Sequence, residues 1–196
     1  MSIAVEALSE ERLAGLVDLF EASSSTCFCR YWHFTGTKNE WLDRCANRPE
    51  ENRAELEASV RAGEPSARAL VALEDDRVVG FMKLVPRATI PKLRTLGVYR
   101  QLDLGDEHTT YSVGCFLVHP ERRKKGVATA LLRAAPDFVK RWGGRAVEGY
   151  PRRSSAPLYD EEAWQGPEPA FAKAGFEVVH DVAPYPVVRL SVPAQD

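Results

Sequence analysis

A strand, a basic loop and a helix follow one another without interruption in Cys115–Arg133, CFLVHPERRKKGVATALLR. The apolar run ends at His119-Pro120, four cationic residues occupy 122–125, and Gly126 leads directly into a helical pattern. The start of a helix offers free N–H groups and the positive end of the helix dipole, and a glycine there lets an anion approach the backbone. The stretch therefore predicts a phosphate site built mainly from main chain. A solvated basic turn is the alternative that the charges alone would favour.

The segments on both sides of this stretch read as alternating strands and helices. Residues 109–118 are almost continuously apolar after Tyr111, as expected for a central strand buried on both faces. The helix that follows is predicted over Val127–Trp142, with a kink near Leu132 because Pro136 lies inside it. Period-two runs and further helical patterns predict the other elements: strands at 3–7, 68–74, 77–85, 146–150, 176–182 and 186–192, and helices at 10–20, 38–46, 50–62 and 168–174.

This order of elements predicts one mixed α/β domain over residues 1–196. It has a central sheet of about seven strands, flanking helices and a helical insert in the N-terminal third, within 21–63. The polar, proline-punctuated segment 86–108 receives no assignment, and its length suggests a functional loop.

Composition excludes several classes of protein. The 196 residues are 44% apolar and 28% charged, and 26 Lys+Arg against 28 Asp+Glu give a net charge of −2. No global basic field would gather nucleic acid or anionic lipid, and no apolar run is long enough to cross a bilayer. We therefore expect a cytoplasmic protein without nucleic-acid or membrane partners. Four cysteines are too few for a disulfide framework, and in that compartment they are expected to remain thiols.

The loop Arg123–Ala128, RKKGVA, satisfies the pattern [R/Q]-x-x-G-x-[G/A], with FLVHPE before it and TALLRAA after it. In this register the chain resembles the GNAT superfamily of acyl-CoA-dependent N-acyltransferases, and the resemblance extends from about Ala67 to Phe176, including AKAGFEVV. The helical insert before Ala67 fits poorly. The resemblance implies that 109–142 binds acyl-CoA, with acetyl-CoA as co-substrate, through Phe116, Leu117, Val118, Arg123, Lys124, Lys125, Gly126, Val127, Ala128 and Thr129.

The same resemblance implies the reaction. An acyl group, acetyl in the first place, passes from acyl-CoA to a primary amine of a small molecule or peptide by direct aminolysis of the thioester. In this family the central strand and the next parallel strand splay apart, so that free backbone groups near Phe116–Val118 hold the pantetheine and polarise the carbonyl. The neighbouring strand would be Val147–Tyr150. Gly114 is either the site of a bulge or close ligand approach, or an ordinary packing residue.

The general acid does not follow from the resemblance, because Phe171 stands where many family members carry a tyrosine. Phenylalanine cannot donate a proton. Tyr159 is the first candidate acid, with Tyr150 or water as alternatives, since a thiolate leaves tolerably without help. The candidate bases are Glu107 and Glu148, with His108 beside the first.

The segment CFCRYW, residues 27–32, allows three interpretations. Cys27 and Cys29 could hold a metal with His33 and Cys45, although the C-x-C spacing is not the common knuckle; they could be buried thiols in an aromatic cluster. Alternatively, the segment forms a wall of the acceptor pocket. We predict no metal, and an acceptor site at Arg30, Tyr31 and Trp32, where Arg30 could pair with an acidic group.

Two functions compete with acyl transfer: a CoA-binding domain that has lost catalysis, and a metal or redox module at Cys27/Cys29. The chain could act as a monomer or a homodimer. The acceptor stays unnamed, because its pocket would be shaped by 21–45 and 86–108.

Overall fold

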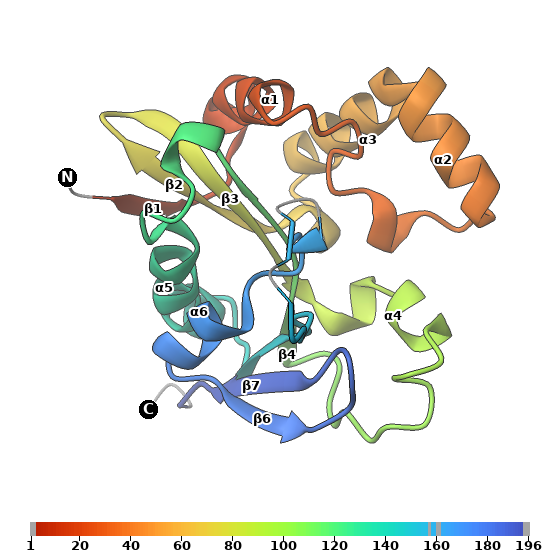
Figure 1. Ribbon diagram of the computed structural model, residues 1–196. Coiled ribbons are helices and arrows are strands. Elements are labelled where there is room, and N and C mark those ends of the chain that lie inside the picture. Colours follow the sequence, from red (N-terminus) through yellow and green to blue (C-terminus); the bar gives the residue numbers. More distant parts are fainter. Residues whose placement is uncertain (1–2, 157, 160–161, 194–196) are drawn as a thin grey trace.

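The computed structural model describes residues 3–156, 158–159 and 162–193, and these form a seven-stranded mixed sheet flanked by helices (Figure 1). The strand order is β1-β2-β3-β4-β5-β7-β6, and β4 and β5 are the one parallel pair among the described strands. The predicted fold class is thereby confirmed. The strands are Ala4–Ala7 (β1), Ala69–Glu74 (β2), Arg77–Pro86 (β3), Thr110–Val118 (β4), Ala146–Gly149 (β5), Glu177–His180 (β6) and Val187–Ser191 (β7).

The helices agree with the predicted ones to within a few residues. Thr37 and Glu40 form a capping box that starts the second helix, and Pro49 occupies the first turn of the third. The fifth helix continues through Pro136 to Arg141. One short helix lies in the unassigned segment 86–108. The helices are Leu13–Ala22 (α1), Lys38–Asn47 (α2), Pro49–Arg61 (α3), Lys92–Thr95 (α4), Val127–Arg141 (α5) and Glu168–Lys173 (α6).

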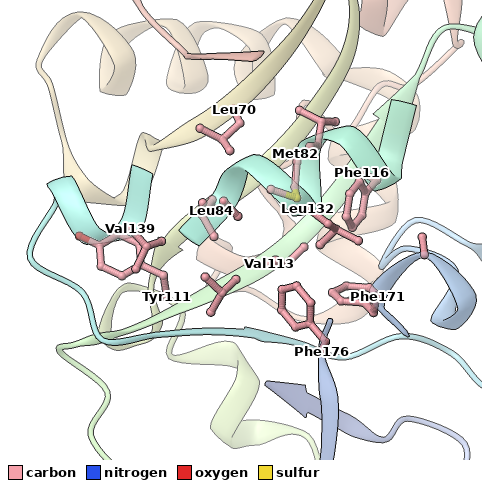
Figure 2. Close-up of a cluster of buried hydrophobic side chains, with 14 of the residues drawn as sticks. Leu70, Met82, Leu84, Tyr111, Val113, Phe116, Leu132, Val139, Phe171 and Phe176 are labelled. Atoms are coloured by element: carbon pink, nitrogen blue, oxygen red, sulfur yellow. The ribbon is translucent and has the colours of Figure 1, made fainter. Parts of the chain in front are cut away.

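Both faces of the sheet are covered, which explains the unbroken apolar character of its central strands. In β2, Leu70 and Ala72 belong to the core cluster under α5. Val71 points to the opposite face of the sheet and packs with Leu16 and Phe20 of α1. Figure 2 shows the cluster on the α5 side, with side chains from β2, β3, β4 and α5 converging. Strands enclosed on both faces need apolar residues at every position.

Strands β4 and β5 separate after a short parallel contact. Their register joins Thr110–Ser112 to Ala146–Glu148, and β4 then continues alone to Val118. On its other side, β4 has a register shift against β3 between Lys83 and Leu84, which leaves Gly114 as an extra residue. Of the alternatives left open for Gly114, the structure therefore shows the bulge. A bulge bends a strand and increases its twist, and it occurs here where the two strands diverge.

The N-terminal insert forms its own layer at one end of the sheet, where α2 and α3 lie side by side (Figure 1). Glu55 of α3 accepts hydrogen bonds from Arg30 and from Arg44 of α2, so one carboxylate joins the loop before α2 to both helices. None of the helices in the described part of the chain has the length and apolarity that crossing a membrane requires.

Candidate acyl-transfer site

A cavity of about 1060 Å³ runs along the C-terminal half of β4. One end is formed by the loop before α5 and the first turn of that helix. The other end is formed by residues of the N-terminal insert and by Trp164, which belongs to the segment before α6. The predicted phosphate site and the predicted acceptor segment thus border one continuous space.

The loop end has the geometry of an anion cradle. Gly126 is the N-cap of α5 at φ +87°, and no side chain caps the helix start. A Cβ built on Gly126 would meet no atom within 4 Å, so its backbone faces open space. Val127, Ala128 and Thr129 follow it along the cavity wall. Their N–H groups precede the first i→i−4 bonds of the helix and are therefore available to a ligand.

The cationic side chains of the loop divide into two groups. Arg122, Arg123 and Lys124 border the cavity, whereas Lys125 is exposed outside it. Arg122 pairs with Glu74 at 2.6 Å, and Arg123 Nε donates to the carbonyl of Val118 at 3.3 Å. Nine of the ten residues predicted to bind acyl-CoA line the cavity: Phe116, Leu117, Val118, Arg123, Lys124, Gly126, Val127, Ala128 and Thr129.

The gap between β4 and β5 is bridged by main chain from further along the sequence. The N–H of Phe116 donates to the carbonyl of Trp164 at 2.6 Å. Val118 lies two residues on, so its N–H points to the same side of the strand. Strand β4 therefore turns backbone donors toward the cavity where β5 no longer pairs with it, and Trp164 takes one of them.

Aromatic rings enclose the far end of the cavity. Tyr31 lies 5.6 Å from Trp32, 5.7 Å from Trp41 and 6.0 Å from Trp164, measured between ring centroids, and Trp32 lies 5.6 Å from Trp164. All four rings line the cavity. The structure brings the predicted residues Tyr31 and Trp32 to this wall, together with two tryptophans that the sequence did not single out.

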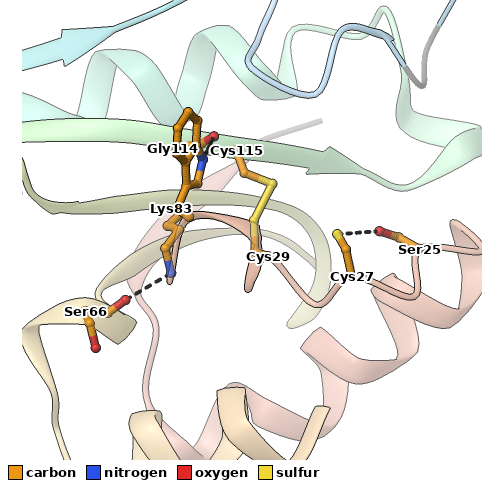
Figure 3. The surroundings of a disulfide bond; sticks show 8 residues. Ser25, Cys27, Cys29, Ser66, Lys83, Gly114 and Cys115 are labelled. Carbon is orange, nitrogen blue, oxygen red and sulfur yellow. Dashed lines mark hydrogen bonds between the residues drawn. A yellow bond between two sulfur atoms is a disulfide. The ribbon is translucent and has the colours of Figure 1, made fainter. Parts of the chain in front are cut away.

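The wall is anchored to β4 at two adjacent residues. Trp32 Nε1 donates to the carbonyl of Gly114 at 2.6 Å, and Cys29 forms a disulfide with Cys115 (Figure 3). A Cβ on Gly114 would lie 3.1 Å from the Trp32 ring, so the glycine permits this approach. The expectation that all four cysteines are thiols is wrong for Cys29 and Cys115; their side chains meet because the loop folds over the bulge.

Arg30 does not take the predicted acceptor-binding position. Its side chain is 5% exposed, donates to Glu55 and is absent from the cavity wall. A buried guanidinium needs a carboxylate partner, and α3 supplies one within the insert. Its aromatic neighbours Tyr31 and Trp32 border the cavity, while the arginine holds the insert together.

None of the three candidate acids and bases lies on the cavity wall. Tyr159 is 76% exposed, and Glu107 lies at the start of the strand away from the cavity. Glu148 is fully buried and accepts from Arg87 and Arg189, each at 3.0 Å. Because Glu148 is fully buried and does not border the cavity, its carboxylate does not reach an amine bound there.

Tyr150, the alternative acid, and Phe171, at the family's usual tyrosine position, are both buried in the core. Tyr150 shares hydrogen bonds of 2.7 Å with Ser112 and Glu148, and burial raises its pKa well above the usual value. Phe171 packs against Phe116 and Phe176. Neither residue borders the cavity.

Two titratable groups lie between the insert and β3: Lys83, which is buried, and His33, which is half-buried. Lys83 is 1% exposed and donates to the carbonyl of Ser66 at 3.0 Å (Figure 3). Burial and, secondarily, the charge of Arg30 lower the Lys83 pKa to about 7. Burial is also the main reason that the His33 pKa is lowered to about 3. His33 is therefore uncharged at neutral pH, whereas Lys83 loses its charge as the pH rises past about 7.

The described residues contain no cluster of three or more His, Cys, Asp or Glu side chains that could hold a metal. Cys27 and Cys45 are free thiols, and Cys27 lies on the cavity wall. The Cys-Cys-His-Cys site considered for this segment is thus not formed, because Cys29 is joined to Cys115 instead.

The comparisons with known proteins agree with this geometry. The model of the family described as "Acetyltransferase (GNAT) family" matches residues 28–163. No curated protein matches the sequence. The fold is similar to that of several solved acetyltransferases.

PaiA N-acetyltransferase of Thermoplasma acidophilum, in complex with coenzyme A, shares 16% identity at a TM-score of 0.54, over 97% of this chain and 99% of that one. YncA of Salmonella typhimurium, a putative acetyltransferase with acetyl-CoA, shares 16% identity at a TM-score of 0.54, over 100% of this chain and 96% of that one. Aminoglycoside 6'-acetyltransferase type Ii shares 17% identity at a TM-score of 0.55, over 98% of this chain and 99% of that one. At such identities the likeness concerns the fold.

Proposed function

Because the chain belongs to the acetyltransferase (GNAT) family, we propose that it transfers an acyl group, acetyl in the first place, from acyl-CoA to a primary amine. One observation carries the proposal: a single cavity joins the open start of α5, the freed donors of β4 and a ring-lined end that can receive an acceptor.

At the loop end, the main chain would hold the diphosphate of the co-substrate. The N–H groups of Val127 and Ala128 and the helix dipole face the same space as the Lys124 ammonium. Gly126 keeps this space free of side-chain atoms. The cradle thus fits a doubly negative group that is recognised chiefly by backbone.

In this structure the Phe116 N–H donates to the carbonyl of Trp164, so it would donate to the thioester carbonyl once the Trp164 carbonyl moves aside. The donor itself is held on a central strand, so it would stabilise the developing oxyanion from a fixed position. Phe116 is itself 7% exposed, which makes this a site of low water content, where such a bond is strong. Amine attack on the carbonyl carbon then forms the new C–N bond, and the C–S bond breaks with the electron pair leaving on sulfur.

The titratable side chains on the cavity wall favour a reaction in which no residue protonates the leaving thiolate. Among the described residues that line the cavity, Tyr31 is the one tyrosine and Glu168 the one carboxylate, and Glu168 accepts from Arg153. The thiolate has an ordinary pKa near ~8.5 and can leave unassisted. The acceptor nitrogen loses two protons: the ammonium proton passes to solvent before the attack, and the second, released as the amide forms, ends on the departed thiolate. The rate is therefore expected to rise with pH toward the pKa of the acceptor amine.

The experiment is a pair of measurements on the full chain. Calorimetry with CoA tests the cradle, and release of free thiol from acetyl-CoA in the presence of primary amines tests the transfer. The proposal predicts CoA binding together with amine-dependent thiol release. CoA binding without thiol release from any amine would instead identify a non-catalytic CoA-binding domain.

A further inference from the structure

The chemistry of the ring-lined end restricts which amine can enter it. The position of the thioester carbonyl at Phe116 leaves the space beyond it, toward Trp32 and Trp164, to the acceptor. Trp32 is 1% exposed and fixed by its bond to Gly114, so it forms a rigid wall. Tyr31 and Trp164 are only half-buried and complete the enclosure.

The ring arrangement suits a flat apolar body. The Tyr31–Trp164 and Tyr31–Trp32 contacts are edge-to-face, with interplanar angles of 79° and 65°, and Trp32 and Trp164 are tilted by 47°. Rings at these angles form a corner in which another ring can make both stacked and edge contacts. A linear aliphatic amine would fill the same corner with far less contact area.

Charge argues against an acceptor with several ammonium groups. Among the described residues, the cavity wall carries six cationic side chains and one carboxylate, Glu168, both of whose oxygens accept from Arg153. Lys92 already places its ammonium 4.3 Å from the centre of the Tyr31 ring, so the cation–π position of that ring is taken. The cationic residues are Arg122, Arg123, Lys124, Arg152, Arg153 and Lys173.

We propose that the acceptor is a primary alkylamine that bears an aromatic ring and carries at most one positive charge, held by Tyr31, Trp32 and Trp164. The inference rests on the proposed acyl transfer and specifies its substrate class. It assigns to Trp164 a role in specificity, distinct from the contact between its carbonyl and β4.

The test compares three amines. n-Butylamine is the reference, tryptamine adds an aromatic ring, and spermidine adds further ammonium groups. With acetyl-CoA, kcat/KM for tryptamine is expected to exceed that for either other amine by about tenfold, the gain from two aromatic contacts. Calorimetry of the same amines against the CoA-loaded protein gives their binding without catalysis, and tryptamine is expected to bind more tightly by the same factor.

Two leucine variants distinguish the loss of a ring in the cavity from a general loss of stability of the fold. Trp164→Leu removes a cavity ring and should lower kcat/KM and binding for tryptamine about fivefold, with CoA affinity unchanged. Trp142→Leu removes a half-buried tryptophan that packs on Tyr111 outside the cavity wall, and should preserve the preference.

Equal use of the three amines, or a preference for spermidine, would overturn the acceptor class and leave acyl transfer intact. A Trp164→Leu variant with an unchanged tryptamine preference would overturn the assignment of this ring. If no amine releases thiol while tryptamine still binds selectively, the acceptor class stands and the catalytic proposal fails.

Discussion

The main chains of Phe116 and Trp164 are joined by a 2.6 Å hydrogen bond across the gap between β4 and β5. The donor is the N–H to which the proposal assigns the thioester carbonyl. In the structure, the carbonyl of Trp164 takes the place that this substrate oxygen would have. Acyl-CoA and the segment carrying Trp164 must therefore compete for one donor, which links co-substrate binding to the acceptor wall.

This competition predicts a fluorescence change at one of the four tryptophans. Saturating acetyl-CoA should displace the Trp164 carbonyl and alter the contacts of its indole with Tyr31 and Trp32. The emission of the native protein should thus change on binding, and most of the change should disappear in Trp164→Phe. Trp142→Phe is the control that keeps it. An undiminished response in Trp164→Phe would mean that Phe116 does not receive the thioester.

Gly126 offers a direct test of the cradle. Gly126→Glu places a side chain and a negative charge in the open space before α5, and CoA affinity should fall by about a hundredfold or more. The matched control is Gly143→Glu, at the opposite end of the same helix.

Gly143 also has a positive φ, +80°, and open space around its Cβ. Both variants should lose about 1 kcal/mol of stability from left-handed backbone strain, measured by urea denaturation. Only Gly126→Glu should lose CoA in calorimetry. Comparable affinity in the two variants would show that the phosphate groups bind elsewhere.

The sequence predicted what depends on local order and missed what depends on long-range contact. The loop Arg123–Ala128 was identified because all its parts, strand end, glycine and helix start, lie within a few residues. The splayed strands were expected from the family resemblance and are present, and of the alternatives left open for Gly114 the structure shows the bulge.

Trp164 could not be found in the same way. It lies in a proline-rich stretch without periodicity, and its partners Phe116 and Tyr31 are distant in sequence. Gly166 was the one indication of an ordered turn beside Trp164. Its φ is +92°, and a Cβ on it would come within 2.5 Å of the Phe116 ring. Arg30 was misjudged for the converse reason: its partner Glu55 lies on the next-but-one helix, and charge alone does not reveal that pairing.

The disulfide between Cys29 and Cys115 predicts a large effect of reductant on stability. It closes a loop with a sequence separation of 86 residues, for which chain entropy gives about 4.6 kcal/mol as an upper figure. Urea denaturation with and without dithiothreitol should reveal a loss of this order, and the Cys29→Ser/Cys115→Ser double variant should not respond to reductant.

Thiol titration of the denatured, unreduced protein is the complementary measurement. Two reactive thiols, those of Cys27 and Cys45, are expected. Four would contradict the disulfide. In the reducing cytoplasm expected from the sequence, the bond would be subject to reduction, and the loop that carries Tyr31 and Trp32 would then keep only the Gly114 contact to β4.

Lys83 predicts a particular pH dependence of stability. Its pKa of about 7 in the fold, against 10.5 ordinarily, arises from burial and from Arg30, with Glu55 and the Cys27 thiol acting in the opposite direction. Between these two values the unfolded chain binds a proton that the folded chain does not. The free energy of unfolding must therefore rise with pH across this range, and the contribution is lost as the pH falls toward 7.

Lys83→Met removes this titration while keeping an apolar stem of similar length. From pH 7 to pH 9, the stability of the native protein should gain about 2 kcal/mol relative to the variant, measured by urea denaturation at both pH values. Lys38→Met is the matched control, because the exposed ammonium of Lys38 stays in water whether the chain is folded or not. Parallel pH profiles for the native protein and Lys83→Met would mean that the Lys83 ammonium remains charged in the fold, with a partner beyond the Ser66 carbonyl.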